Sequence, residues 1–148
     1  MTPLDLTQRP PRPLRAELDG IAYLPRAIDK ARASLPGGDL GVYLIMSDEV
    51  VTMSAMFYRK MGTTADEFAG VVASAEDDHA VAAWLRARVE PEQIDGWHKR
   101  LFGIHLSDIP EPALARVLER HPAGRTMPAS TLLVDVIEAD DAEMFTAT

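Results

Sequence analysis

The sequence predicts an all-α fold, a single compact domain of about six or seven short helices with an extended N-terminal arm. Three observations lead to this prediction. Apolar residues recur at helical spacing in one segment after another, and capping residues or prolines stand where those segments begin. Few stretches could pair as strands, and a lone strand has no partner. The 148 residues fit one domain, with the arm over residues 1–20 and a helical body over residues 21–148.

The N-terminal arm is marked by interleaved arginines and prolines, namely Arg9, Pro10, Pro11, Arg12, Pro13 and Arg15. Proline fixes φ at about −65° and disfavours helical conformation in the residue before it, so residues 8–14 should run extended, as in polyproline II. This conformation has three residues per turn. The spacing of the three arginines therefore predicts that their guanidinium groups lie along one edge of the arm.

The first helix of the body is predicted over residues 23–35. Pro25 suits its first turn, apolar residues follow at helical spacing, and the Pro-Gly-Gly stretch at residues 36–38 ends it. Residues 41–46 are rich in β-prone side chains but have no evident partner strand. We interpret them either as extended chain or as the approach to the next helix.

Four further helices have clear start signals and are predicted over residues 49–61, 65–72, 76–88 and 91–103. Ser47 or Asp48 can cap the first of them, and Gly62 ends it. Thr64 caps the second, with a glutamate three residues later that completes a capping box. Acidic residues lead the third, and Pro91 suits the first turn of the fourth.

The last part of the chain predicts two more elements. Asp108 or Pro110 begins a sixth helix. Ser130 caps a segment over residues 131–137 whose apolar spacing favours a seventh helix, although its β-branched residues leave a strand as the alternative. The acidic run over residues 138–143 is expected to be a solvent-exposed end.

Composition excludes several classes of protein. The absence of cysteine removes disulfides, thiolate metal sites and thiol nucleophiles. No two of the four histidines stand four residues apart, so no metal site is predicted, and no motif indicates a cofactor. No apolar run approaches the roughly 20 residues of a membrane span, and a net charge of −8 disfavours nucleic acid. We therefore expect an acidic, soluble, cytoplasmic protein that binds neither membrane nor nucleic acid.

Two sequence motifs resemble those of a known family: DLTQRPPR at residues 5–12 and LPRAIDKARA at residues 24–33. In this order they resemble the patterns D-L-T-x-R-P-P-R and L-P-R-x-x-D-K-x-R-A of an uncharacterised bacterial family, domain of unknown function 5069. Residues 57–62 and 80–85 are also similar to later parts of that family. The resemblance implies a short soluble protein, and it supplies no catalytic residue because no activity is established for the family.

The best candidate site combines the arm with the first predicted helix. Arg26 and Lys30 stand four residues apart on that helix and so share a face. If the arm folds back along it, five cations could bind one anion: Arg9, Arg12, Arg15, Arg26 and Lys30. Forked arginine donors suit a carboxylate or a phosphate. The alternative is that these arginines pair with the protein's own acids and hold the arm on the body.

The predicted function follows mainly from what the sequence lacks. It contains neither the G-x-S-x-G motif of a serine hydrolase nor a phosphate-binding glycine loop, and no catalytic residue is predicted. This favours a small non-catalytic binding or protein-interaction module that associates with itself or with a protein partner. The alternative is a protein that binds an anion or small molecule between the arginine arm and the first helix, and that could be an enzyme.

Overall fold

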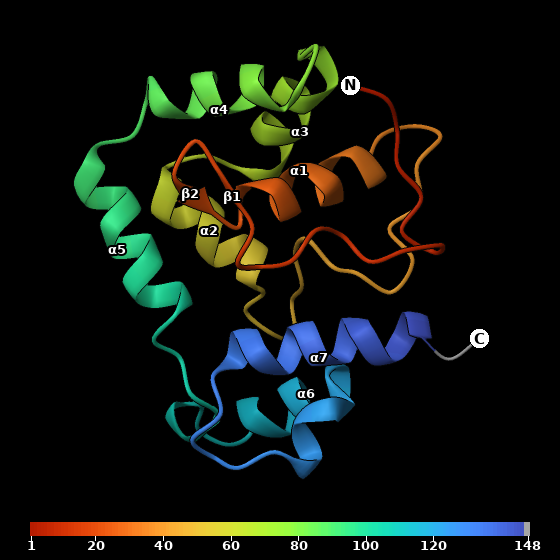
Figure 1. Cartoon of the computed structure of the whole chain (residues 1–148), viewed down its shortest axis with the longest axis vertical. Coiled ribbons are helices and arrows are strands. Elements are labelled where there is room, and N and C mark those ends of the chain that lie inside the picture. Colours follow the sequence, from red (N-terminus) through yellow and green to blue (C-terminus); the bar gives the residue numbers. More distant parts are fainter. Residues whose placement is uncertain (147–148) are drawn as a thin grey trace.

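The computed structural model describes residues 1–146 and confirms the all-α prediction (Figure 1). The helices of this part of the chain are α1 (Leu24–Ala33), α2 (Met53–Met61), α3 (Ala65–Ser74), α4 (Asp78–Arg86), α5 (Pro91–Leu101), α6 (Ala113–Arg120) and α7 (Leu133–Thr146). The shorter elements are the strands β1 (Glu17–Leu18) and β2 (Ile21–Ala22) and the 3-10 helices η1 (Leu106–Asp108) and η2 (Pro122–Thr126). No helix among these residues has the length and apolar content to cross a membrane.

The helices form two groups joined by α5 and by loops. Figure 1 shows α1 to α4 at one end of the molecule, α6 and α7 at the other, and α5 along one side. Within these groups α1 packs against α3, α2 against α5, and α7 against η2. The N-terminal arm runs between α1 and α7 before it reaches β1, so that the arm and α7 meet near the middle of the molecule.

An aromatic cluster forms the centre of the core. The ring of Tyr23 lies 5.4 Å from that of Phe57 and 5.6 Å from that of Trp97, and Phe57 lies 5.3 Å from Trp97. Trp97 Nε1 donates to the carbonyl oxygen of Ala22 at 2.9 Å, which satisfies its only polar group. Trp97 is fully buried. This cluster fixes α2, α5 and the start of α1 relative to one another.

Several helix ends lie where the sequence predicts them. Thr64 accepts a hydrogen bond from the backbone N–H of Glu67 at 3.2 Å and caps α3. Pro91 is the first residue of α5. Gly62 ends α2 with a φ of 70°, a left-handed conformation that glycine adopts without steric cost.

Two predicted helix starts are wrong. Helix α2 begins at Met53, because Thr52 is the residue whose hydroxyl accepts the Ala55 N–H, at 3.0 Å. Ser47 instead accepts the N–H of Glu49 in a local turn, at 3.1 Å. Helix α6 begins at Ala113 and not near Asp108. The Asp108 carboxylate instead accepts the backbone N–H of His105 at 2.8 Å, at the start of η1. In both cases the predicted cap is used in a shorter local motif.

The alternatives left open by the sequence are settled. Residues 41–46 contain turns and irregular chain without a strand, while residues 133–137 are helical and begin α7. Helix α7 then continues through the acidic run, where Asp140 and Asp141 are each only 8% exposed. The prediction that this run is a solvent-exposed end is therefore wrong for these two carboxylates, because each has partners inside the protein.

A β-hairpin in residues 17–22 was not predicted. Its two turn residues, Asp19 and Gly20, have φ values of 52° and 77°. Positive φ at both central residues is typical of the type I′ turn of a β-hairpin. Leu18 pairs with Ile21 across it, and Glu17 with Ala22. The Asp-Gly pair between two apolar residues is the sequence signal for this hairpin.

Candidate functional site

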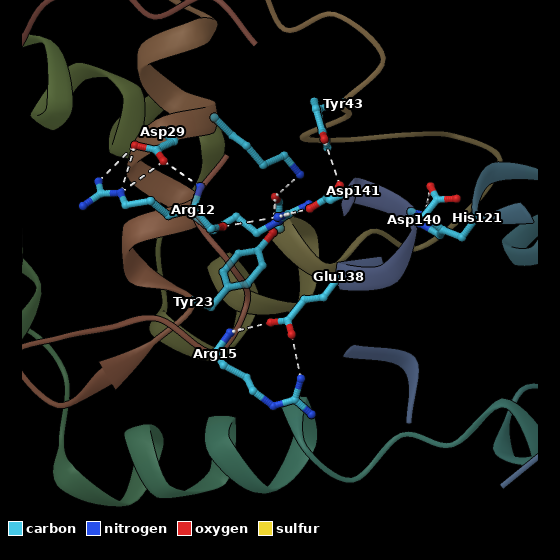
Figure 2. Close-up of polar contacts among 12 residues, drawn as sticks. Arg12, Arg15, Tyr23, Asp29, Tyr43, His121, Glu138, Asp140 and Asp141 are labelled. Carbon is cyan, nitrogen blue, oxygen red and sulfur yellow. Dashed lines mark hydrogen bonds and ion pairs between the residues drawn. The ribbon is translucent and has the colours of Figure 1, made fainter. Parts of the chain in front are cut away.

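Arg12 holds the arm on the body of the protein (Figure 2). Its Nη2 lies 3.0 Å from Asp29 Oδ1 on α1, and its Nη1 lies 2.7 Å from Asp78 Oδ2 on α4. Its backbone N–H donates to Asp29 Oδ2 at 2.8 Å. Burial lowers the pKa of the Arg12 guanidinium, but its hydrogen bonds to Asp78 and Asp29 outweigh burial and raise this pKa above its ordinary value. The acceptors of Arg12 are thus supplied by the protein itself.

Arg15 and Arg9 face other parts of the molecule. Arg15 of the arm contacts two carboxylates of α7, with Nη2 2.6 Å from Asp135 Oδ1 and Nη1 2.7 Å from Glu138 Oε2. Arg9 is exposed and lines an open surface recess together with Arg12. That recess is also lined by four carboxylates, those of Asp29, Glu76, Asp77 and Asp78. Arg9 and Arg12 therefore share one recess, Arg15 lies near other acidic groups, and anion binding by all three at one place stays a prediction.

Arg26 connects α1 to the buried end of α7. Its Nη1 lies 2.8 Å from Asp141 Oδ2 and also donates to the Arg12 carbonyl oxygen at 3.2 Å. Tyr43 donates its hydroxyl to the other oxygen of Asp141 at 2.8 Å, a contact that Figure 2 shows. The guanidinium of Arg26 lies 5.5 Å from the centre of the Tyr43 ring. Burial, followed by the contact with Asp141, raises the pKa of the Tyr43 hydroxyl.

Lys30 is buried without a carboxylate partner among the described residues. Its side chain is one turn from Arg26 on α1, the residue is 5% exposed, and Nζ donates to Ser54 Oγ at 2.9 Å. Ser54 Oγ is in turn 2.8 Å from the hydroxyl of Tyr23. Burial lowers the pKa of the Lys30 amine well below its ordinary value, and the positive charges of Arg26 and Arg120 lower it further. Both effects favour the neutral form of the Lys30 amine.

Arg26 and Lys30 line a cavity of about 80 Å³ between α1, the segment before α2, and α6 and α7. We call it the cationic cavity. Its polar lining consists of Tyr23, Arg26, Lys30, Tyr43, Thr52, Arg120 and His121. Its apolar lining consists of Leu14, Leu44, Val50, Val51, Met53, Met56, Val117, Leu133 and Ile137. Tyr23 is fully buried, whereas Val51 is 66% exposed, so the cavity extends from the core to the surface.

The lining of the cationic cavity contains three basic side chains, those of Arg26, Lys30 and Arg120. Among the residues that the structure describes, no aspartate or glutamate lines it, although the chain has 23 acidic and 15 basic side chains. Asp141 neutralises Arg26 from outside the lining. Arg120 donates from Nη2 to the Val42 carbonyl oxygen at 3.2 Å and forms none of the ion pairs found in residues 1–146. This arrangement can accept an anion, and it presents a lysine amine to whatever binds.

His121, which lines the cavity, forms a partly buried contact with Asp140. His121 Nδ1 lies 3.4 Å from Asp140 Oδ2, and Asp140 Oδ1 accepts the backbone N–H of Ala123 at 3.4 Å. Burial lowers the pKa of His121, and the contact with Asp140 offsets this only in part. Within the described part of the chain, no group of three histidine or acidic residues is placed to hold a metal ion.

Sequence reasoning missed part of this site. Arg120 and His121 lie far from α1 in the chain, and only the packing of the C-terminal helices brings them to it. Tyr43 lies in the irregular segment between α1 and α2, where no local spacing relates it to Arg26. The sequence does contain one signal for the acidic partner of Arg26. Two carboxylates on the same face of a helix as apolar residues are typical of buried ion-pair partners. Asp140 and Asp141 stand one helical turn after the apolar pair Val136 and Ile137.

Comparison with known families identifies the chain. A family described as a domain of unknown function, DUF5069, matches residues 8–143. The chain belongs to this family. The match includes every residue that lines the cationic cavity, from Leu14 to Ile137, and confirms the family resemblance. No curated protein matches the chain. Since the DUF5069 description assigns no activity, the chemistry of the cavity is the basis for a functional proposal.

Proposed function

We propose that this DUF5069 protein binds a small organic carboxylate in the cationic cavity. The observation that carries the proposal is the lining of the cavity, with three basic residues on α1 and α6 and no acidic one among the described residues. In a chain of net charge −8, most of the surface repels anions, so a lining without an acidic side chain stands out. This is the anion-binding role predicted for Arg26 and Lys30, with Arg120 in place of the arm arginines.

The electrostatics of the cavity favour Arg120 and Arg26 as the anion ligands. Arg120 has a backbone carbonyl as its partner, so its charge is not neutralised by a carboxylate in contact with it. Both hydrogen bonds of Arg26 found in the described structure come from Nη1. A guanidinium group has five N–H donors, which leaves both arginines able to donate to a further acceptor. A charge-assisted hydrogen bond at such a buried place is stronger than one at the surface.

The apolar part of the lining defines the rest of the ligand. A volume of about 80 Å³ holds several water-sized groups and excludes large cofactors. Methionine, valine, leucine and isoleucine side chains line the part of the cavity away from the charges. A ligand with a carboxylate head and a short apolar body satisfies both parts, whereas inorganic phosphate leaves the apolar part unused.

Calorimetric titration of the full chain with short carboxylates tests the proposal. We expect propionate to bind and to raise the melting temperature, and inorganic phosphate to bind more weakly. Arg120→Gln removes a charge-assisted hydrogen bond of about 1.5–3 kcal/mol, which should weaken propionate binding by a factor of about ten or more.

Arg116→Gln is the matched control. Arg116 lies one turn earlier on α6 and also donates to a backbone carbonyl oxygen, that of Glu49 at 3.1 Å, but it does not line the cavity. Its substitution should leave propionate binding unchanged. Equal losses in both variants, or no binding of any short carboxylate to the wild type, would overturn the proposal.

A second proposal concerns the predicted self-association. Four cations line a recess between α2 and α5: Arg59, Lys60, Lys99 and Arg100. None of them belongs to the ion pairs found among residues 1–146. The recess is complementary in charge to the acidic surface of a second copy of the chain. We expect sedimentation to show a dimer that salt and the Lys60→Glu substitution dissociate, and a monomer at every concentration and salt level would contradict this.

A further inference from the structure

We propose that Lys30 forms a Schiff base with the carbonyl carbon of a 2-oxo carboxylate bound in the cationic cavity. This inference rests on the proposed function, because the two arginines must hold the carboxylate for the carbonyl to reach the amine. It adds covalent chemistry to a binding site, and it names the substrate class as a short acid whose carbonyl group is next to its carboxylate.

The position of Lys30 is the first argument. A lysine that is buried for structural reasons normally has an acidic partner, because an unpaired buried charge is costly. Lys30 has only the hydroxyl of Ser54 as a hydrogen-bond partner among the described residues, and its side chain lines the cavity with Arg26 and Arg120. A lysine amine that is desolvated and next to other cations is kept neutral, which is the form that attacks carbonyl groups.

The hydroxyl groups beside Lys30 are the second argument. Ser54 is fully buried, with Oγ 2.9 Å from Lys30 Nζ and 2.8 Å from the Tyr23 hydroxyl. Tyr23 has a φ of 76°, a backbone conformation that residues other than glycine rarely adopt. Such a conformation costs about 1–3 kcal/mol. This unusual backbone, held by the aromatic core, directs a tyrosine hydroxyl to the partner of the lysine.

The arginines are the third argument, because they determine which carbonyl compound fits. With its carboxylate on Arg26 and Arg120, a 2-oxo acid has its carbonyl carbon one bond away from the bound head. Lys30 is one helical turn from Arg26 on α1, so the amine and the Arg26 guanidinium lie on the same wall of the cavity. The short apolar tail of the acid then lies against the apolar lining.

The reaction needs no further reactant. The lone pair of Lys30 Nζ attacks the carbonyl carbon, a C–N bond forms, and the π electrons of the carbonyl move to its oxygen. One proton passes from the nitrogen to that oxygen, with the Ser54 and Tyr23 hydroxyls as a relay, and gives a carbinolamine. The hydroxyl group then leaves with the second nitrogen proton as water, and the C=N bond forms. Amine and carbonyl compound are thus converted to imine and water.

Reductive trapping tests the inference. The full chain is incubated with pyruvate and sodium cyanoborohydride, which reduces an imine to a stable secondary amine, and the modified peptides are mapped by mass spectrometry. The chain has only three lysines, Lys30, Lys60 and Lys99, and the last two are exposed. We expect the adduct on Lys30, its loss in Lys30→Met, and its suppression by excess propionate. Lactate, which has no carbonyl group, should bind without forming an adduct.

The outcomes separate this inference from the proposed function. If propionate binds but pyruvate leaves Lys30 unmodified, or modifies Lys60 and Lys99 equally well, the Schiff base is wrong and the anion site stands. If acetone modifies Lys30 as readily as pyruvate does and no carboxylate binds, the lysine is reactive but the anion site is wrong. Ser54→Ala should slow trapping while leaving propionate affinity intact, and an unchanged trapping rate would overturn the role of Ser54 in proton relay.

Discussion

Arg26 and Asp141 form a buried ion pair of 2.8 Å that joins α1 to α7. Their side chains are 4% and 11% exposed, and Tyr43 occupies the second oxygen of the carboxylate. Because Arg26 also lines the cationic cavity, the contact that connects the two ends of the chain also builds the wall of the proposed site.

Removing the acidic partner from this pair should be costly. Asp141→Asn leaves a buried guanidinium without its counter-charge, and we expect the free energy of unfolding to fall by about 3–5 kcal/mol in urea denaturation. Asp135→Asn is the control, because Asp135 pairs with Arg15 at the surface, with side chains 47% and 42% exposed. That change should cost less than about 1 kcal/mol. Similar costs in the two variants would show that the Arg26–Asp141 pair is not a structural contact.

Arg12 should contribute more to stability than Arg15, although both tie the arm to the body. Asp29, the partner of Arg12, has a side chain only 3% exposed and would keep a buried charge after the substitution Arg12→Gln. We expect a loss of about 2 kcal/mol, and less than about 1 kcal/mol for Arg15→Gln. Limited proteolysis should cut the arm of the Arg12 variant first. Equal protection of the arm in both variants would contradict this ranking.

Lys30 should make the stability of the protein depend on alkaline pH. Its pKa in the folded state is well below the ordinary 10.5, so the unfolded chain binds more protons between these two values. Stability therefore rises with pH through this window, by at most about 1.4 kcal/mol per pH unit. Lys30→Met removes the effect. The wild type should gain stability relative to the variant as the pH rises toward 10.5, and parallel pH profiles would mean that Lys30 is charged in the folded protein.

His121 should also make the stability of the protein rise with pH, in the acidic range. Burial lowers its pKa below the ordinary 6.5, so the unfolded chain binds the extra proton first as the pH falls. Stability contributed by the neutral imidazole is present above 6.5 and is lost as the pH drops toward the lowered folded-state pKa. In urea titrations between about pH 7 and about pH 5, His121→Asn should lose less stability than the wild type. A steeper loss in the variant would contradict a neutral His121.

Much of the fold could be predicted from local sequence signals. Thr64, Pro91 and Gly62 act through hydrogen bonds and φ values of their own neighbourhood, and they define helix ends without help from distant residues. Ser47 and Asp108 misled the prediction because each can serve a turn or a 3-10 helix as well as an α-helix. Competition between local motifs of similar energy is decided by packing, which the sequence does not display.

The site was harder to predict for a related reason. Arg26 and Lys30 were found because they share a face of one helix, a local relationship. Arg120, Tyr43 and Asp141 come close to Arg26 only when α7 packs against the arm and α6 lies beside α7. No local sequence spacing encodes those contacts. Arg12 and Arg15 have the predicted period of three but contact α1, α4 and α7, so their ion pairs were decided by where the acids lie.

A crystal structure of the protein grown in saturating propionate tests whether the cationic cavity binds a carboxylate. We expect a carboxylate inside the cationic cavity, within hydrogen-bond distance of Arg120 and Arg26, with its apolar end toward Met53 and Ile137. Propionate bound only elsewhere, such as in the recess between α2 and α5, or a cavity that holds water alone, would contradict it.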